Sequence, residues 1–125
     1  MGHDLRLFDR VLQRARCLAG TLRIIDPLRR DDAEQQGIDA QTRQLKLYEM
    51  PSCPYCCKVR RAMRQLGLDI PSVDIGRNDD AYNTLLSATD ETQVPCLYIH
   101  DSGTEPRWLF ESNDIVAYLR RRFGD

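Results

Sequence analysis

The sequence has no long uncharged apolar run and almost no net charge. Nowhere in its 125 residues do about 20 apolar residues follow one another, the length needed to cross a bilayer. The N-terminus lacks the continuous apolar core of a signal peptide. A net charge of −1 gives no general attraction for nucleic acid. These absences favour a soluble globular protein without a nucleic-acid partner, and the cytoplasm is the expected location.

The cysteines do not form the framework of a small secreted protein. Their number, five, is odd, and three of them lie within Cys53–Cys57. The chain is also long enough to bury a core without disulfides. A reducing compartment fits this pattern, and no internal repeat or low-complexity tract complicates it.

The most informative stretch is Ser52-Cys53-Pro54-Tyr55-Cys56-Cys57. A β-like run precedes it and a helical run closed by Gly67 follows it, and a C-x-x-C motif at such a junction is typical of redox proteins. Pro54 suits the first helical turn. Cys53 then lies at the helix start, where free backbone N–H groups and the helix dipole favour a thiolate. Cys53 is therefore the predicted nucleophile, and Cys56, one turn later, is the predicted resolving thiol.

A zinc site is the competing interpretation of this motif. Cys96 and His100 would complete a C-x-x-C…C-x-x-x-H pattern. The residues from Cys96 to His100 read as a strand, however, and strand residues four apart are separated by about 13 Å, too far to share one metal. The sequence therefore favours redox chemistry and predicts no metal site.

The charge distribution divides the chain into two parts. Residues 1–30 hold seven arginines and three aspartates, whereas the remainder holds 11 basic and 16 acidic residues. Apolar residues at helical spacing predict a basic amphipathic helix over residues 4–26, ending before Pro27. That helix packs on its own protein, or docks on an anionic membrane or a partner. Residues 28–44 are predicted to be a loosely packed polar connector, with a short helix only from Ile38.

Residues 45–125 are predicted to form one domain, with residues 1–44 as an appendage. The pattern predicts the order β-α-β-α-β-β-α and a four-stranded mixed sheet, because a helical crossover favours a parallel pair and the later hairpin is antiparallel. The expected strands are 45–50, 70–75, 96–100 and 108–110, and the expected helices are 54–66, 80–87 and 113–123. Ser112 is the expected cap of the last helix.

Three motifs in this order resemble glutaredoxins and the thioredoxin-like N-terminal domain of glutathione transferases. They are Cys53-Pro54-Tyr55-Cys56, Val94-Pro95 and Glu111-Ser112-Asn113-Asp114. The resemblance covers about residues 45–123 and implies a thioredoxin-like α/β fold and a glutathione-dependent disulfide oxidoreductase. Of these two families, the Glu-Ser-Asn-Asp stretch resembles the transferases more. A transferase also has an all-helical second domain, for which no residues follow Asp125, and a cysteine at the catalytic position suits thiol exchange.

The resemblance also implies a glutathione site. Pro95 should follow a cis peptide bond, which leaves the Val94 backbone free to pair with the ligand. The backbone N–H groups of Ser112 and Asn113 should hold the γ-glutamyl carboxylate. Glu111 should receive the amino group, and Tyr55 should stand beside the sulfur. Glutathione would be a co-substrate beside the disulfide substrates.

Two positions depart from the glutaredoxin pattern. Met50 stands where that family usually carries a lysine, and Thr92 stands where it often carries an arginine. Both cations normally meet the glycyl carboxylate. Substitutes for them would have to come from Lys58, Arg60 or Arg61, although charges on a helix surface are usually solvated.

Two other functions stay open from the sequence. The domain could be a non-catalytic or redox-sensing glutathione-binding module that docks through residues 4–26. It could also be a dimeric iron–sulfur carrier, which the rigid Pro54 disfavours. Cys57 and Cys96 are expected to be packing residues.

Overall fold

The computed structural model describes residues 30–101 and 103–124. The strands are β1 (Leu45–Glu49), β2 (Ser72–Asp74), β3 (Cys96–Ile99) and β4 (Arg107–Leu109), and the helices are α2 (Asp32–Thr42), α3 (Pro54–Gln65), α4 (Asp79–Thr89) and α5 (Ser112–Phe123). No helix among these residues is long and apolar enough to span a membrane. The helix predicted over residues 4–26 lies outside the described residues and stays a prediction.

The strands form one mixed sheet in the order β2-β1-β3-β4. β1 pairs with β2 in parallel, and β3 pairs antiparallel with both β1 and β4. The parallel pair is connected through α3, as the sequence predicted, and β2 starts directly after Pro71 at the edge of the sheet, where a proline removes no ladder bond. The chain therefore has the predicted thioredoxin-like α/β fold.

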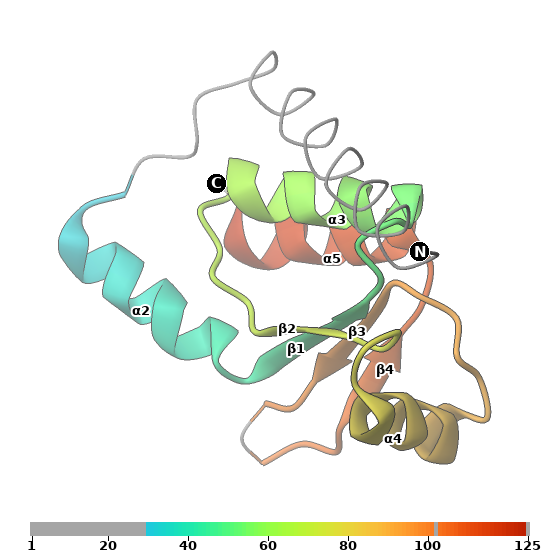
Figure 1. The fold of residues 1–125 in the computed structure, drawn as a ribbon. Coiled ribbons are helices and arrows are strands. Elements are labelled where there is room, and N and C mark those ends of the chain that lie inside the picture. Colours follow the sequence, from blue (N-terminus) through green and yellow to red (C-terminus); the bar gives the residue numbers. More distant parts are fainter. Residues whose placement is uncertain (1–29, 102, 125) are drawn as a thin grey trace.

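Helices cover both faces of the sheet (Figure 1). Side chains in a strand alternate between faces, so Leu45 and Leu47 pack with α3 and α5, while Tyr48 packs with α4. On the first face the core joins Val59 of α3 and Ile115 of α5, both fully buried. Strand β1 is thus held inside the sheet, between β2 and β3, with a packed layer on each face.

The predicted connector contains a regular helix, which corrects the sequence interpretation. α2 spans Asp32–Thr42, and the side chain of Asp31 caps it by accepting from the Glu34 N–H at 2.7 Å. Thr42 is buried, and Ile38 packs against the core. Polar contacts add to this packing, so the segment is tied to the domain despite its few apolar residues.

The guanidinium of Arg30 joins two helix ends. It donates to the carbonyl oxygen of Leu66 at 2.6 Å and to that of Phe123 at 2.8 Å. Leu66 caps α3 and Phe123 ends α5, so one side chain satisfies carbonyls that neither helix can pair internally. Gln35 donates in the same region to the carbonyl of Gly67 at 2.9 Å. We call Arg30 and Gln35 the helix-end clamp.

α3 and α5 lie side by side and run in the same direction (Figure 1). Near their first turns Lys58 donates to Asn113, and at their far ends Arg30 bridges them. Both helices therefore start at the same edge of the domain. That edge carries the C-x-x-C motif.

Candidate active site

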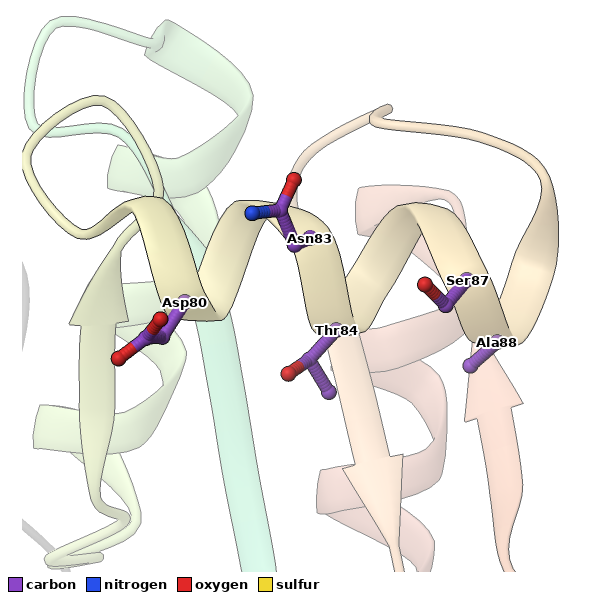
Figure 2. Close-up of a pocket in the computed structure, with 5 residues that line it drawn as sticks. All are labelled: Asp80, Asn83, Thr84, Ser87 and Ala88. Atoms are coloured by element: carbon purple, nitrogen blue, oxygen red, sulfur yellow. The ribbon is translucent and has the colours of Figure 1, made fainter.

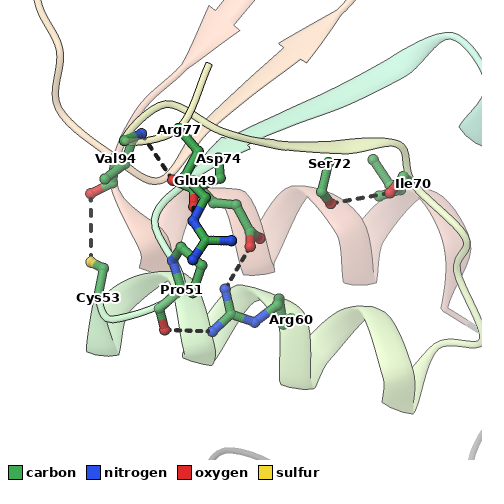
Figure 3. Close-up of polar contacts among 10 residues, drawn as sticks. Glu49, Pro51, Cys53, Arg60, Ile70, Ser72, Asp74, Arg77 and Val94 are labelled. Atoms are coloured by element: carbon green, nitrogen blue, oxygen red, sulfur yellow. Dashed lines mark hydrogen bonds and ion pairs between the residues drawn. The ribbon is translucent and has the colours of Figure 1, made fainter. Parts of the chain in front are cut away.

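Cys53 is the N-cap of α3. Its backbone is extended, with φ −82° and ψ 121°, and Pro54 follows in the first turn, as the sequence predicted. The thiol of Cys53 makes no capping hydrogen bond to the helix. Its Sγ lies 4.0 Å from the carbonyl oxygen of Val94, as Figure 3 shows, and the residue is half-buried. The sulfur is thus reachable by solvent and sits above unpaired helix amides.

Cys56 has a different environment from Cys53. It is completely buried, and burial raises the pKa of its thiol to about 12; a hydrogen bond from the Met50 backbone lowers this pKa and the neighbouring Cys53 raises it, both less than burial does. At neutral pH it is therefore a protonated thiol. The free thiols of the described residues are Cys53, Cys56 and Cys96, while the half-buried Cys57 is disulfide-bonded.

The contrast between the two thiols predicts selective alkylation. Iodoacetamide at pH 7.5 should modify Cys53 and leave Cys56 unmodified in the folded protein, because the thiolate is the reacting form. The rate at Cys56 should rise about tenfold per pH unit, since the thiolate fraction grows toward a pKa of about 12. Peptide mapping by mass spectrometry measures both rates. Cys96, also buried with a pKa raised to about 12, is the internal control. Equal labelling of Cys53 and Cys56 at pH 7.5 would contradict the prediction that Cys53 is the reactive thiol and Cys56 the unreactive one.

The peptide bond between Val94 and Pro95 is cis, as the resemblance implied. It adjoins a groove of about 340 Å³, lined by Tyr55, Gln93, Val94, Pro95, Glu111 and Ser112. This volume falls within the range of about 300–1,000 Å³ that small-molecule sites occupy. We call it the cis-proline groove. It brings together five of the six residues predicted to bind glutathione, from three separate segments of the chain.

Glu111 and Gln93 form one wall of the groove. Gln93 donates from Nε2 to Oε1 of Glu111 at 3.0 Å. Glu111 has φ 68°, a conformation that costs a residue with a side chain about 1–3 kcal/mol and that is concentrated at functional sites. Gln93 was not predicted from the sequence as a site residue. Its position directly before Val94-Pro95 was the only available signal.

The start of α5 differs from the prediction in one detail. Glu111, not Ser112, occupies the N-cap position, and no side chain caps the helix. Ser112 is the first helical residue and is buried against the groove. The first amides of α5 are therefore without a side-chain cap, as a site for a carboxylate requires.

The sixth predicted binding residue, Asn113, lies elsewhere. Its side chain accepts a hydrogen bond from Lys58 and faces the space between α3 and α5. Its backbone remains in the first turn of α5. Only a main-chain role in the cis-proline groove is consistent with this position.

The substitute cations considered from the sequence do not reach the groove. Lys58 contacts Asn113, and Arg60 pairs with Glu49 at 2.8 Å. Among the described residues that line the groove there is no lysine or arginine. Met50 packs in the core on the α4 side, and Thr92 is half-buried.

An ion pair between Glu49 and Arg60 lies next to the C-x-x-C segment. Their side chains are only 10% and 16% exposed, and Arg60 also donates to the carbonyl of Pro51 at 3.3 Å (Figure 3). A buried ion pair of this kind contributes little net stability but fixes geometry when its hydrogen bonds are satisfied. It joins the end of β1, the loop before Cys53 and the middle of α3.

A second depression, along the outer side of α4, carries no chemistry. It is a shallow surface lined by Asp80, Asn83, Thr84, Ser87 and Ala88 (Figure 2). These residues include no thiol, their one ionisable side chain is Asp80, and they lie on a single helix. The described residues also include no group of three or more histidine, cysteine or acidic side chains placed to hold a metal.

A family model described as "Glutathione S-transferase, N-terminal domain" matches residues 47–125, more than half of the chain. The chain belongs to the glutathione S-transferase N-terminal domain family. The match includes the C-x-x-C motif and the whole cis-proline groove. No curated protein matches the sequence.

Several solved structures are similar to parts of this chain. A trimeric glutathione transferase of Leishmania has 26% identity and a TM-score of 0.53, and the alignment covers 63% of this chain and 18% of the transferase. The chain thus spans less than a fifth of that enzyme's length. A buckwheat glutaredoxin in complex with glutathione has 21% identity and a TM-score of 0.49, covering 74% of this chain and 83% of the glutaredoxin. A maleylacetoacetate isomerase of Anaeromyxobacter dehalogenans has 23% identity and a TM-score of 0.43, and the alignment covers 66% of this chain and 36% of the isomerase.

Proposed function

We propose that this protein is a glutathione-dependent thiol–disulfide oxidoreductase with Cys53 as the nucleophile. The observation that carries the proposal is the half-exposed sulfur of Cys53, 4.0 Å from the Val94 carbonyl at the edge of the cis-proline groove. A nucleophile, a strand-like binding backbone and an anion-binding helix start then meet at one place. Family membership supports the choice of glutathione as co-substrate.

The groove offers contacts for two ends of glutathione. The backbone of Val94 can pair with the cysteinyl part of the tripeptide, as an added strand does. The first amides of α5, at Ser112 and Asn113, can hold the γ-glutamyl carboxylate, and Glu111 can receive the amino group. Tyr55 is 65% exposed, so its ring and hydroxyl are available beside the sulfur. With no cation among the described lining residues, binding should depend mainly on backbone groups.

The first chemical step transfers glutathione from the substrate to the enzyme. The Cys53 thiolate attacks the glutathionyl sulfur of a mixed disulfide, the Cys53–glutathione disulfide forms, and the substrate S–S bond breaks. The substrate sulfur leaves as a thiolate and takes a proton from water. The number of disulfides is unchanged, so no external oxidant or reductant is needed.

The second step regenerates Cys53. The thiolate of one reduced glutathione attacks the glutathionyl sulfur on Cys53 and releases the Cys53 thiolate and glutathione disulfide, which combines this glutathione with the glutathionyl group taken from the substrate. Cys56 can instead attack the Cys53 sulfur, which forms an internal disulfide, breaks the Cys53–glutathione bond and releases glutathione. Its complete burial and its pKa of about 12 keep it protonated, so we assign the main route to glutathione.

Mass spectrometry after treatment with oxidised glutathione tests the proposal. The expected product is a protein carrying one glutathione on Cys53, an added mass of about 305 Da for one thiol–disulfide exchange. Cys56→Ser should retain this adduct, because its only remaining route is the mixed disulfide. An adduct that maps to another cysteine, or none at all, would reject Cys53 as the nucleophile.

A further inference from the structure

A second groove runs between α3 and α5, next to the cis-proline groove. It has a volume of about 380 Å³, and its polar lining consists of Lys58, Arg61 and Gln65 from α3 and Asn113 and Arg120 from α5. Three of these five side chains are cationic, and none of the described lining residues is acidic. We call it the basic groove. Its potential should be strongly positive compared with a protein whose net charge is −1.

Arg61 shows that the groove has an unmet hydrogen-bonding group. Its Nε is buried and has no hydrogen-bond partner among residues 30–101 and 103–124. Buried polar groups are nearly always paired, so an acceptor supplied by a ligand would complete the site. Lys58 and Arg120 are exposed, and neither forms an ion pair with an acidic side chain among the described residues.

The basic groove and the cis-proline groove are lined by neighbouring residues at the start of α5. Ser112 lines the cis-proline groove, and the next residue, Asn113, lines the basic groove. Along α3, Lys58 and Gln65 follow Cys53 by distances of about 7 and 18 Å at 1.5 Å per residue. An extended peptide attached through its cysteine would cover that distance with about two to five residues.

We infer that the basic groove recognises carboxylates that flank the disulfide of a polypeptide substrate. The inference rests on the proposed function and specifies its substrate class, namely glutathionylated proteins with acidic residues near the modified cysteine. Glutathione occupies the cis-proline groove, and the polypeptide joined to it extends between α3 and α5. Opposite charges across such a surface mainly accelerate encounter and select the partner.

Two glutathionylated peptides test this preference. They are identical except that one carries glutamates and the other glutamines at the second to fourth positions on both sides of the cysteine. The wild-type protein at low salt should react with the glutamate peptide at a kcat/KM about tenfold higher, and the difference should fall to about twofold or less near 0.5 M salt. Equal kcat/KM values at low salt would overturn the inference.

Arg120 and Arg43 form a matched pair of substitutions. Arg120→Gln should lower kcat/KM for the glutamate peptide about threefold, and Arg120→Glu about tenfold, with little change for the glutamine peptide. Arg43 is an exposed arginine at the end of α2, beside the start of β1, while Cys53 follows the other end of that strand. Arg43→Glu should change neither value. An equal effect of Arg43→Glu, or an equal loss for both peptides, would refute a local role for the groove.

Binding separates this inference from the proposed function. If the wild-type protein reduces neither peptide, the proposed activity is wrong, and the groove is then judged by affinity alone. Fluorescence anisotropy with the Cys53→Ser protein should show about threefold tighter binding of the labelled glutamate peptide, lost in Cys53→Ser/Arg120→Glu. Equal affinity for the two peptides would overturn the inference whatever the activity.

Discussion

Substitution of Cys53 by serine should reduce glutathione-dependent disulfide reduction at least about a thousandfold. Sulfur is both the attacking atom and one partner of the intermediate disulfide, and a serine hydroxyl can replace neither. The loss of a nucleophile typically removes nearly all of the rate that the catalytic groups supply. A coupled assay that follows the oxidation of glutathione with a small mixed disulfide measures the effect. The fold should be unaffected, because Cys53 is only half-buried and caps no amide with its side chain.

The neighbouring cysteines provide the controls for this experiment. Cys56→Ser should keep activity within about tenfold of wild type, since glutathione can complete the cycle without it. Cys96 is buried and directly follows Pro95. Cys96→Ser tests whether this thiol can act in place of Cys53. Full activity in Cys53→Ser would reject the mechanism. A loss in Cys56→Ser as large as that in Cys53→Ser would show that the internal disulfide is obligatory.

Replacement of Arg30 by methionine should lower the free energy of unfolding by about 2 kcal/mol. The substitution removes the hydrogen bonds to Leu66 and Phe123 and leaves two helix-end carbonyls without their charged donor. A hydrogen bond to a charged group contributes about 1.5–3 kcal/mol, and partial exposure reduces the value here. Methionine keeps most of the apolar length of the side chain, so the loss reports the guanidinium. Urea unfolding followed by circular dichroism provides the measurement.

Arg43→Met serves as the matched control for Arg30→Met. It removes the same charge from an exposed arginine at the end of α2, and its effect should stay within about 0.5 kcal/mol. A destabilisation equal to that of Arg30→Met would assign the effect to net charge and not to the helix-end clamp. The alkylation rate of Cys53 should be unchanged in both variants, because the clamp lies at the far ends of α3 and α5.

Most of the domain could be predicted from the sequence because its signals are local. The predicted strand 96–100 contains β3. The predicted helix 54–66 begins at the same residue as α3 and ends one residue later than α3. The predicted ends of the two edge strands, β2 and β4, were less accurate, because pairing with a neighbouring strand decides where an edge strand ends. β2 was expected over residues 70–75 but only Ser72–Asp74 pair with β1, and β4 is shifted by one residue toward the N-terminus. Edge strands have a partner on one side only, so their ends depend on that partner and not on their own composition.

α2 shows what a local pattern cannot reveal. Its sequence is polar and contains Gly37, which disfavours a helix interior by about 1 kcal/mol. The compensation is non-local: Arg30 and Gln35 reach carbonyls of residues 66, 67 and 123. The sequence between residues 28 and 44 does not indicate where those carbonyl acceptors lie. The domain boundary at residue 44 stays a prediction.

The candidate site was predictable to the extent that it rests on motifs. The C-x-x-C motif indicated the two cysteines, and the family resemblance supplied the cis bond at Pro95 that the structure contains. The unusual backbone of Glu111, its contact with Gln93 and the hydrogen bond between the Asn113 side chain and Lys58 were not predictable. All three depend on segments about 20 to 60 residues apart that only the fold brings together.

The parallel arrangement of α3 and α5 has a consequence for how charge is balanced in the domain. Two helices aligned in the same sense place their negative ends together and their positive ends together, an arrangement that is unfavourable unless each end is neutralised. The chain itself neutralises the negative ends, by placing the guanidinium of Arg30 across both. The positive end of α5 carries Asp114 in its first turn, whereas the first turn of α3, beneath Cys53, has no acidic residue and can be neutralised by an incoming anion. An anionic thiol compound that binds beside Cys53 would therefore meet a favourable electrostatic field that the folded domain already provides.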